Sequence, residues 1–205
     1  ATISVLTFRK QDLTAQDNYL TEVQAEYSVH WLKRKTDIFQ TEIAETIKKL
    51  NAQFHPRGKN KVLECLQFGG NHEFWQDFPD EEEIAIYLQH CYEFAVNYIG
   101  FLKTDKNIIC ALTVTEPNRR NLFLYYLPIT DKWKVKAISN DKSDNGNKLQ
   151  MRDGSGNPIY KTRRFVTKPL LCHSEFWKQR GEQMSYSVLQ ECFYQSVSKR
   201  YGAKR

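Results

Sequence analysis

Short runs of apolar residues, separated by turn signals, indicate a chain rich in β-strands. Runs of β-branched and aromatic residues bounded by Gly, Pro, Asn or Asp are typical of strands. This pattern predicts strands over residues 3–8, 62–68, 107–115, 121–129, 132–137, 148–152 and 158–165. The last two flank the sequence Asp-Gly-Ser-Gly-Asn at 153–157, which predicts a β-hairpin.

Helical spacing of apolar residues predicts three principal helices, over residues 37–54, from Asp80 to Gly100, and over residues 185–201. Asp80 and Glu83 have the spacing of an N-terminal capping box, and Ser187 and Gln190 repeat it. Residues 10–35 show no clean period, so we expect a loop there with room for one short helix.

These elements indicate an α+β fold, in which helices pack on an antiparallel β-sheet. The connections between the strands of residues 107–138 are too short for a crossover, so neighbouring strands are expected to pair antiparallel. A chain of 205 residues fits one domain. We therefore expect a single domain over residues 1–205, which can be the N-terminal part of a longer chain.

Charge is distributed unevenly along the chain. Residues 1–130 hold 14 Lys and Arg against 17 Asp and Glu, a net charge of −3. Residues 131–205 hold 16 against 7, a net charge of +9. A basic segment attached to a mildly acidic body is typical of a protein that binds a polyanion, because cationic side chains displace counterions from phosphates. A solvated basic surface, or a face that meets an acidic protein, is the alternative.

The remaining composition argues against a membrane or disulfide-rich protein. No apolar run approaches the roughly 18 residues that span a bilayer, and no basic leader precedes an apolar segment. The five cysteines are scattered without a Cys-x-x-Cys pair, which favours reduced thiols over disulfides or a structural zinc. The five histidines show no mutual metal-ligand spacing either. We expect a cytoplasmic protein without a resident metal or cofactor.

Basic residues are the strongest candidates for a nucleic-acid interface. Lys132, Lys134 and Lys136 recur at period two, which places them on one face of a strand. Further candidates flank the hairpin and the preceding turn, namely Arg119, Arg120, Arg152, Lys161, Arg163 and Arg164. Such side chains contact phosphates, while the nearby aromatic residues Tyr125, Tyr126, Trp133 and Tyr160 are available to stack on unpaired bases. The alternative is a solvated sheet face with those aromatic residues in the core.

The segment from Asn107 to Thr130 resembles the central hairpin of the MobV or Pre family of plasmid mobilisation relaxases. The resemblance rests on the strand that ends in Thr-Val-Thr-Glu116 and on Leu-Tyr-Tyr-Leu-Pro-Ile-Thr130. It extends to Phe74-Trp75, to Tyr92-Glu-Phe94 with Tyr98-Ile-Gly100, and to the closing segments Leu189–Phe193 and Lys199–Gly202. It covers residues 62–202 and implies a relaxase-like fold with single-stranded or hairpin DNA as the partner.

The family's hairpin carries the metal-binding motif His-x-Asp-Glu-x-x-Pro-His-x-His, from which this sequence departs. Glu116 matches the motif glutamate, but Thr113 replaces the first histidine. The other two histidine positions fall on Arg120 and Leu122, or on Asn121 and Phe123 after a one-residue shift. None of these side chains replaces imidazole as a ligand of a divalent metal.

The family's nucleophile is a histidine or tyrosine near the N-terminus. The best local match, Asp17-Asn-Tyr19, offers Tyr19, and Tyr27 and His30 are later candidates. With Glu116, these three residues form the candidate catalytic set.

Three functions stay open from the sequence. The first is a relaxase-like nucleic-acid-binding protein that serves plasmid or mobile-element mobilisation, replication or recombination and has lost or altered its nicking chemistry. The second is an active single-strand nickase with a divergent site, which would use Mn²⁺ or Mg²⁺. The third is a protein-interaction module whose basic face meets an acidic partner, with protein partners of a mobilisation or replication complex as further candidates.

Overall fold

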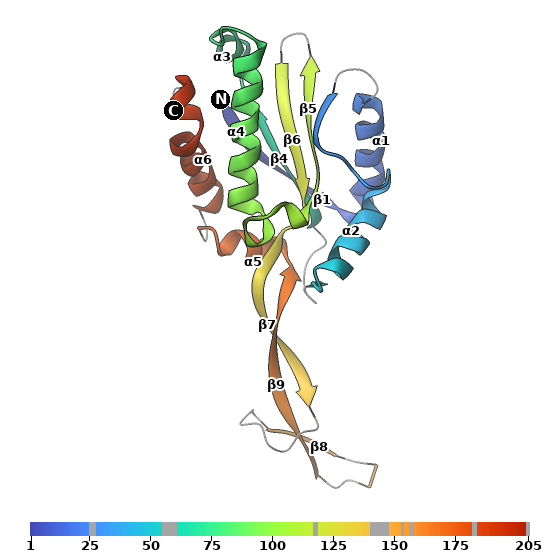
Figure 1. Cartoon of the computed structure of the whole chain (residues 1–205). Coiled ribbons are helices and arrows are strands. Elements are labelled where there is room, and N and C mark those ends of the chain that lie inside the picture. The colour runs from blue at the N-terminus through green and yellow to red at the C-terminus, as the bar shows by residue number, and fades with distance from the viewer. Residues whose placement is uncertain are drawn as a thin grey trace.

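The computed structural model describes residues 1–24, 28–54, 61–116, 119–139, 148–152, 154–155, 158–181 and 184–203. For residues 24, 28, 116, 119, 131–139, 148–152 and 158–167 it describes the backbone alone. Within these ranges the chain has an α+β fold, with helices on both faces of an antiparallel sheet (Figure 1). The predicted fold class is therefore confirmed.

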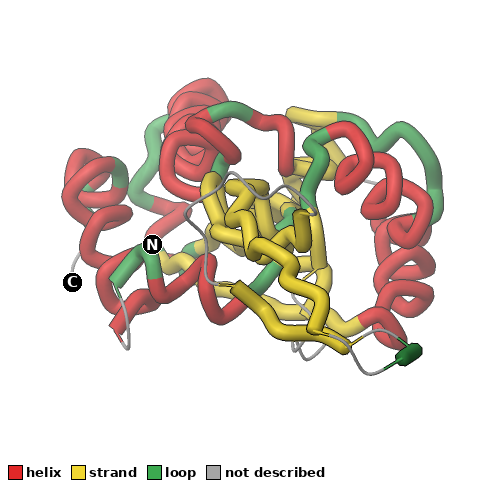
Figure 2. The backbone as a smooth tube through the Cα atoms, turned by 90° about the horizontal axis from the view of Figure 1, so that it is seen from below, coloured by secondary structure: helices red, strands yellow, loops and turns green. Residues whose placement is uncertain are grey.

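A five-stranded sheet forms the centre of the molecule. Its order is β1 (Thr2–Arg9), β4 (Lys61–Gly69), β6 (Arg119–Tyr126), β5 (Ile108–Glu116) and β2 (Ser28–Leu32). Every neighbouring pair is antiparallel. In the predicted hairpin, Glu116 pairs with Arg119 at the end where β5 continues into β6. Seen along the sheet in Figure 2, helices lie on both flanks of the strands. Both faces of the central strands are therefore buried.

Each face of the sheet has its own apolar core. One face packs against α3 (His72–Gln76), α4 (Glu81–Ile99), α5 (His173–Lys178) and α6 (Ser185–Ser196), through side chains such as Leu66, Leu124 and Phe193. The other packs against α1 (Leu13–Gln24) and α2 (Phe39–Lys49), through Leu20, Phe39 and Leu112. Fully buried side chains on both faces supply the hydrophobic stabilisation that holds the layers together.

Helix α4 confirms its predicted start. The Asp80 side chain accepts a hydrogen bond from the backbone N–H of Glu83 at 2.9 Å. Three glutamates occupy the first turn, where they interact favourably with the helix dipole. The buried stripe includes Ile84, Leu88, Cys91 and Ala95, as the spacing predicts. The corresponding prediction for the last helix is wrong, because α6 begins at Ser185 and neither its N-cap residue Met184 nor Ser187 caps it through a side chain.

The prediction for residues 10–35 is correct in allowing one helix but wrong in assigning the rest to a loop. This segment holds a 3₁₀ turn (Lys10–Asp12), the twelve-residue helix α1 and the edge strand β2. Helix α1 carries few apolar residues, and Leu13 and Leu20 alone are fully buried in it. Strand β2 pairs on one side only, which leaves Val29 63% exposed and weakens its apolar pattern. Helix α2 ends at Lys49, before the two-residue strand β3 (Gln53–Phe54).

A second sheet projects from the body. Strands β7 (Ile129–Ser139), β8 (Lys148–Arg152) and β9 (Pro158–Leu171) form a long antiparallel extension, which we call the arm (Figure 1). The predicted hairpin of β8 and β9 is confirmed. The expectation that β7 continues the central sheet is wrong: β7 pairs with β9, and β3 adds to β9 in parallel. Among the described residues, no helix is long and apolar enough to cross a membrane.

Asn107 ties the arm to the body at the start of β5. Its side chain is fully buried, accepts the N–H of Phe101 at 2.6 Å, and donates to the carbonyls of Ile99 and Leu127 at 3.0 and 2.9 Å. These bonds join the end of α4 to the residues that precede β7.

We expect Asn107→Ala to lower the free energy of unfolding by about 3 kcal/mol, because it leaves one buried donor and two buried acceptors unsatisfied. Urea denaturation measures the loss. Asn97→Ala, on the exposed side of α4, is the matched control and should cost about 0.5 kcal/mol or less. Equal losses in the two variants would contradict the role of Asn107.

Candidate nucleic-acid interface

The sequence predicts a catalytic or binding site at the end of the hairpin where β5 continues into β6. Glu116 and Arg119 form its last backbone pair, and their side chains lie outside the described part of the chain. Thr113 pairs with Leu122, and Thr115 pairs with Arg120. Opposite partners in a ladder share a face, so Thr113, Leu122 and Arg120 lie on one face of the sheet. Asn121 and Phe123, the shifted alternatives, belong to the other face.

Trp31 covers Thr113, the residue at the position of the family's first histidine. The indole Nε1 of Trp31 donates a hydrogen bond to the hydroxyl of Thr113 at 2.8 Å. Thr113 is 3% exposed, and the Trp31 ring stacks on Tyr92 of α4. The hydroxyl of Thr113 is therefore engaged and screened from solvent.

The other two positions are equally unsuited to a metal. Leu122 has no exposed surface and belongs to the apolar core under α4. The Arg120 guanidinium forms an ion pair with Glu81 in the first turn of α4. A hydroxyl engaged elsewhere, an alkyl group and a cation offer no ligand set for a divalent metal, so the residues present do not fit one. Among the described residues, no group of three or more His, Cys, Asp or Glu side chains is placed to hold a metal ion.

The candidate nucleophiles lie on the other face of the sheet. Tyr19 is 38% exposed on α1 and meets the edge of Phe123, with 6.4 Å between ring centroids. Phe123 pairs with Leu112, which in turn pairs with His30 of β2. Phe123, Leu112 and the half-buried His30 therefore form one cross-strand row, and Tyr19 of α1 packs on this row at Phe123. Tyr27 lies outside the described residues.

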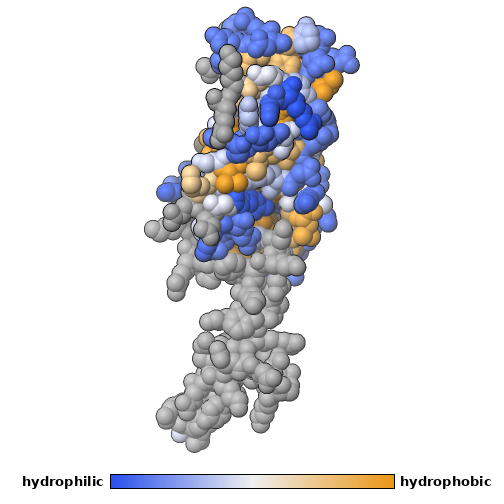
Figure 3. Space-filling model, turned by 90° about the vertical axis from the view of Figure 1, so that its left-hand side faces the viewer, coloured by the Kyte–Doolittle hydropathy of each residue, from blue (hydrophilic) through white to orange (hydrophobic). Residues whose placement is uncertain are grey.

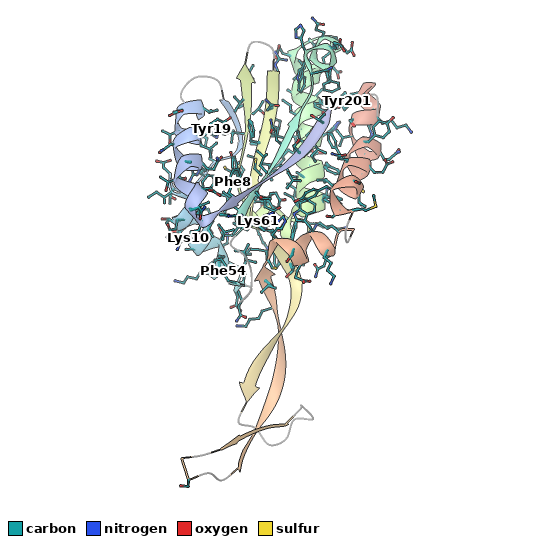
Figure 4. The ribbon with its side chains drawn as sticks, turned by 180° about the vertical axis from the view of Figure 1, so that it is seen from behind. Phe8, Lys10, Tyr19, Phe54, Lys61 and Tyr201 are labelled. Carbon is teal, nitrogen blue, oxygen red and sulfur yellow. The ribbon has the colours of Figure 1, made fainter. Side chains whose placement is uncertain are left out.

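Glu116 is distant from this row. It lies four residues beyond Leu112 along β5, which corresponds to about 13 Å. The structure thus places Tyr19 and His30 on the same face of the sheet, and it places Glu116 far along the strand from both. Figure 4 shows Tyr19 on the α1 side and Tyr201, which packs against α4, on the opposite side of the sheet.

The basic candidates of the second sheet concentrate on the arm. Lys134 pairs with Thr167, Lys136 with Phe165, and Ile138 with Arg163. This register places positions 134, 136 and 163 on one face of the β7–β9 ladder, whereas position 132 lies in an irregular stretch between Thr130 and Trp133. Position 164 belongs to the opposite face. Lys161 lies in β9 and Arg152 in β8, and the side chains of these basic residues lie outside the described part.

Two aromatic residues proposed to stack on bases are part of the core instead. Tyr125 is 1% exposed and packs against Phe39, and Tyr126 has no exposed surface. Burial raises the pKa of both phenols. Their prediction as base-stacking residues is therefore wrong, because the alternation of β6 turns them toward the two buried faces. The side chains of Trp133 and Tyr160 lie outside the description.

The cysteines behave as buried thiols. Cys65, Cys91, Cys110 and Cys172 are buried and unpaired, and Cys192 is half-buried. Burial raises the pKa of the Cys110 thiol to about 12, so the reactive thiolate is scarce near neutral pH. The expectation of reduced, packed cysteines is confirmed.

A charged cluster that was not predicted from the sequence lies at the end of the sheet opposite the connection between β5 and β6. Glu64 of β4 has no exposed surface and accepts hydrogen bonds from the Tyr126 hydroxyl at 2.5 Å and from Trp177 Nε1 at 2.8 Å. The Nδ1 atom of His173 contacts its other oxygen. A charged residue within the apolar pattern of residues 62–68 was the available signal, but its partners are more than 60 residues away in sequence.

Comparisons with known proteins agree with this fold. No protein-family model matches the sequence, and no curated protein matches it. Among solved structures, the chain is similar to the Mn-bound MobM relaxase domain (MOBV; Mob_Pre) bound to 22-nucleotide pMV158 oriT DNA, with 13% identity and a TM-score of 0.50. It is similar to a second structure of that domain, bound to oriT DNA with a 3′ thiophosphate, with 12% identity and a TM-score of 0.50. Each match covers 63% of this chain and 71% of the relaxase domain. The chain therefore has the fold of the MobV/Pre relaxase domain.

Proposed function

We propose that this chain is a relaxase-like DNA-binding protein of plasmid or mobile-element mobilisation, replication or recombination that has lost nicking activity of the family's kind. The observation that carries this proposal is the hairpin itself. The chain has a relaxase-like fold, and the sequence resemblance aligns the three metal-binding histidines with Thr113, Arg120 and Leu122, or with Thr113, Asn121 and Phe123 after a one-residue shift. The basic arm supplies the contacts to the sugar–phosphate backbone.

A gel-shift assay with hairpin oligonucleotides tests DNA binding. We expect retarded complexes at low salt and weaker binding as salt rises, since phosphate contacts release counterions. Single-stranded and double-stranded oligonucleotides of the same length define the preferred structure. Absence of any complex at low salt would refute the proposal, and an acidic protein partner captured after nuclease treatment would favour an interaction module.

Loss of nicking predicts no covalent intermediate. Incubation with single-stranded DNA and Mn²⁺, followed by denaturing electrophoresis, should leave the oligonucleotide intact. Because Tyr19 packs on the cross-strand row that contains His30, Tyr19→Phe and His30→Gln are the variants that would abolish an adduct if one formed. A covalent protein–DNA adduct that disappears in either variant would establish the active alternative.

The replaced ligand positions also predict that the chain takes up no Mn²⁺ at the hairpin. We expect no saturable binding in Mn²⁺ titrations followed by electron paramagnetic resonance. A variant with three new histidines and without the covering indole should create a Mn²⁺ site, since three imidazoles then share one face. Its substitutions are Thr113→His, Arg120→His, Leu122→His and Trp31→Ala. The same three histidines beside an intact Trp31 are the control and should bind more weakly. Saturable binding by the native chain at this hairpin would contradict the prediction.

A further inference from the structure

Glu64 and His173 form a pair that the proposed DNA-binding surface does not use. Glu64 pairs with Tyr126, the last residue of β6, and is therefore distant from the connection between β5 and β6. The end of β4 that holds Glu64 faces the arm (Figure 1). The Glu64 carboxylate receives three donors, from Tyr126, Trp177 and His173. A buried carboxylate is tolerated only when it is paired and hydrogen-bonded, so these contacts fix the positions of all four side chains.

His173 has one nitrogen directed to the core and the other to Lys61. Its Nδ1 contacts Glu64, and its Nε2 lies 3.4 Å from the Lys61 Nζ. A lysine ammonium only donates hydrogen bonds, so this contact requires Nε2 to accept and Nδ1 to carry the proton. The imidazole then links the charge of Lys61 to that of Glu64. Figure 4 shows Lys61 on β4 near the root of the arm.

An open pocket of about 340 Å³ lies beside this pair, between α5 and the first turn of α6. None of its lining residues is acidic, and they comprise His173, Ser174, Trp177, Lys178, Met184, Ser185, Tyr186 and Ser187. The lining therefore combines one lysine with the hydroxyl groups of three serines and one tyrosine. Figure 3 looks onto the side of the molecule formed by α6, where apolar patches interrupt a hydrophilic surface.

The pocket also offers an exposed aromatic ring. Tyr186 is 42% exposed and stands edge-on against Trp177, with 4.8 Å between ring centroids. The Trp177 indole N–H donates a hydrogen bond to the buried Glu64, which fixes the position of the Trp177 ring against which Tyr186 packs. Burial and the nearby Glu64 raise the pKa of Tyr186 to about 12, which keeps the phenol neutral. Met184 adjoins it and is 66% exposed.

We propose that this pocket binds one unpaired nucleotide of a single-stranded DNA. The base stacks on Tyr186 beside Met184, and the phosphate is held by the Lys178 ammonium and the Ser174 hydroxyl, which line the same pocket. An aromatic face beside cations is the combination that single-strand-binding proteins use for successive nucleotides. The pocket lies at the root of the arm, because His173 follows the last residue of β9 by two positions. DNA that follows the arm would therefore reach the body at this pocket. This inference rests on the proposed DNA-binding function.

Photo-crosslinking tests the site directly. A short oligothymidylate that carries 4-thiothymidine is irradiated with the full chain, and the crosslinked peptide is identified by mass spectrometry. We expect adducts within residues 173–187. Tyr186→Ala combined with Lys178→Ala should reduce these adducts at least about fivefold, the low end of the contribution of one aromatic–base stack. Both side chains are exposed, so the double variant should retain the fold.

Ile86→Ala combined with Lys10→Ala is the matched control, since it removes one exposed apolar and one exposed basic side chain elsewhere. This control should crosslink like the native chain. If the oligonucleotide binds but its adducts map only to the arm or the β5–β6 hairpin, the pocket proposal fails while the DNA-binding function stands. If no oligonucleotide binds at low salt, both proposals fail. Equal crosslinking in the two double variants would also overturn the assignment.

Discussion

Replacement of Lys132, Lys134 and Lys136 by alanine should weaken binding of hairpin DNA by about 100- to 1,000-fold at 0.1 M salt. Each phosphate contact contributes about 0.9 to the slope of log affinity against log salt concentration, so three lost contacts lower that slope by about 2.7. Positions 134 and 136 share one face of the arm with position 163, and position 132 precedes them on β7. Removal of three neighbouring cations therefore removes a continuous part of the proposed surface.

Fluorescence anisotropy at several salt concentrations measures both quantities. Three exposed lysines of the body, Lys10, Lys48 and Lys199, provide a triple-alanine control with the same change in net charge. This control should weaken binding far less, because long-range charge is screened beyond roughly 10 Å at that salt. Equal losses in the two triple variants would mean that net charge, and not the arm, determines affinity.

Glu64→Ala should lower the free energy of unfolding by about 3–5 kcal/mol, a large part of the 5–15 kcal/mol that is typical of a domain. The substitution leaves the Tyr126 hydroxyl and the Trp177 indole N–H buried without an acceptor. It also removes the partner of His173 and opens a cavity where β4, β6 and α5 meet. Chemical denaturation, followed by circular dichroism, gives the value.

Two further variants make this result interpretable. Glu64→Gln keeps the side-chain volume but replaces one acceptor oxygen by an amide N–H₂, which only donates. Part of the three contacts is therefore lost, and we expect a smaller decrease in the free energy of unfolding than for Glu64→Ala. Glu45→Ala, on the exposed side of α2, should change stability by about 0.5 kcal/mol or less. If Glu64→Ala were no worse than Glu45→Ala, the buried carboxylate would not anchor α5 to the sheet.

The elements that were predicted correctly are those whose ends are marked by capping or turn residues close in sequence. Asp80 and Glu83 identified the start of α4, and the turn at 153–157 identified the β8–β9 hairpin. Helix α1 was missed because its buried residues are few and its other positions are polar. Edge strand β2 was missed because half of its surface faces solvent.

The candidate site was predictable only in part. The apolar run over residues 107–115 placed Thr113 on the right strand, but it did not reveal that Trp31, 82 residues away, donates to Thr113. The same limit applies to Glu64 and His173, which are separated by 109 residues. Contacts of this separation arise from the order of strands in the sheet, which no local pattern encodes.

The sequence by itself determined the α+β class, the two strands of the central hairpin, the basic character of the last third, and the absence of histidines at the hairpin. These properties follow from periodicity and residue type, which act over a few neighbouring positions. Tertiary structure alone decided that β7 leaves the central sheet to form an arm, that Tyr125 and Tyr126 are buried, and that a histidine and a buried carboxylate meet beside an open pocket. The reason is that pairing between distant strands minimises the exposed apolar surface of the whole chain, and that minimum depends on all elements at once.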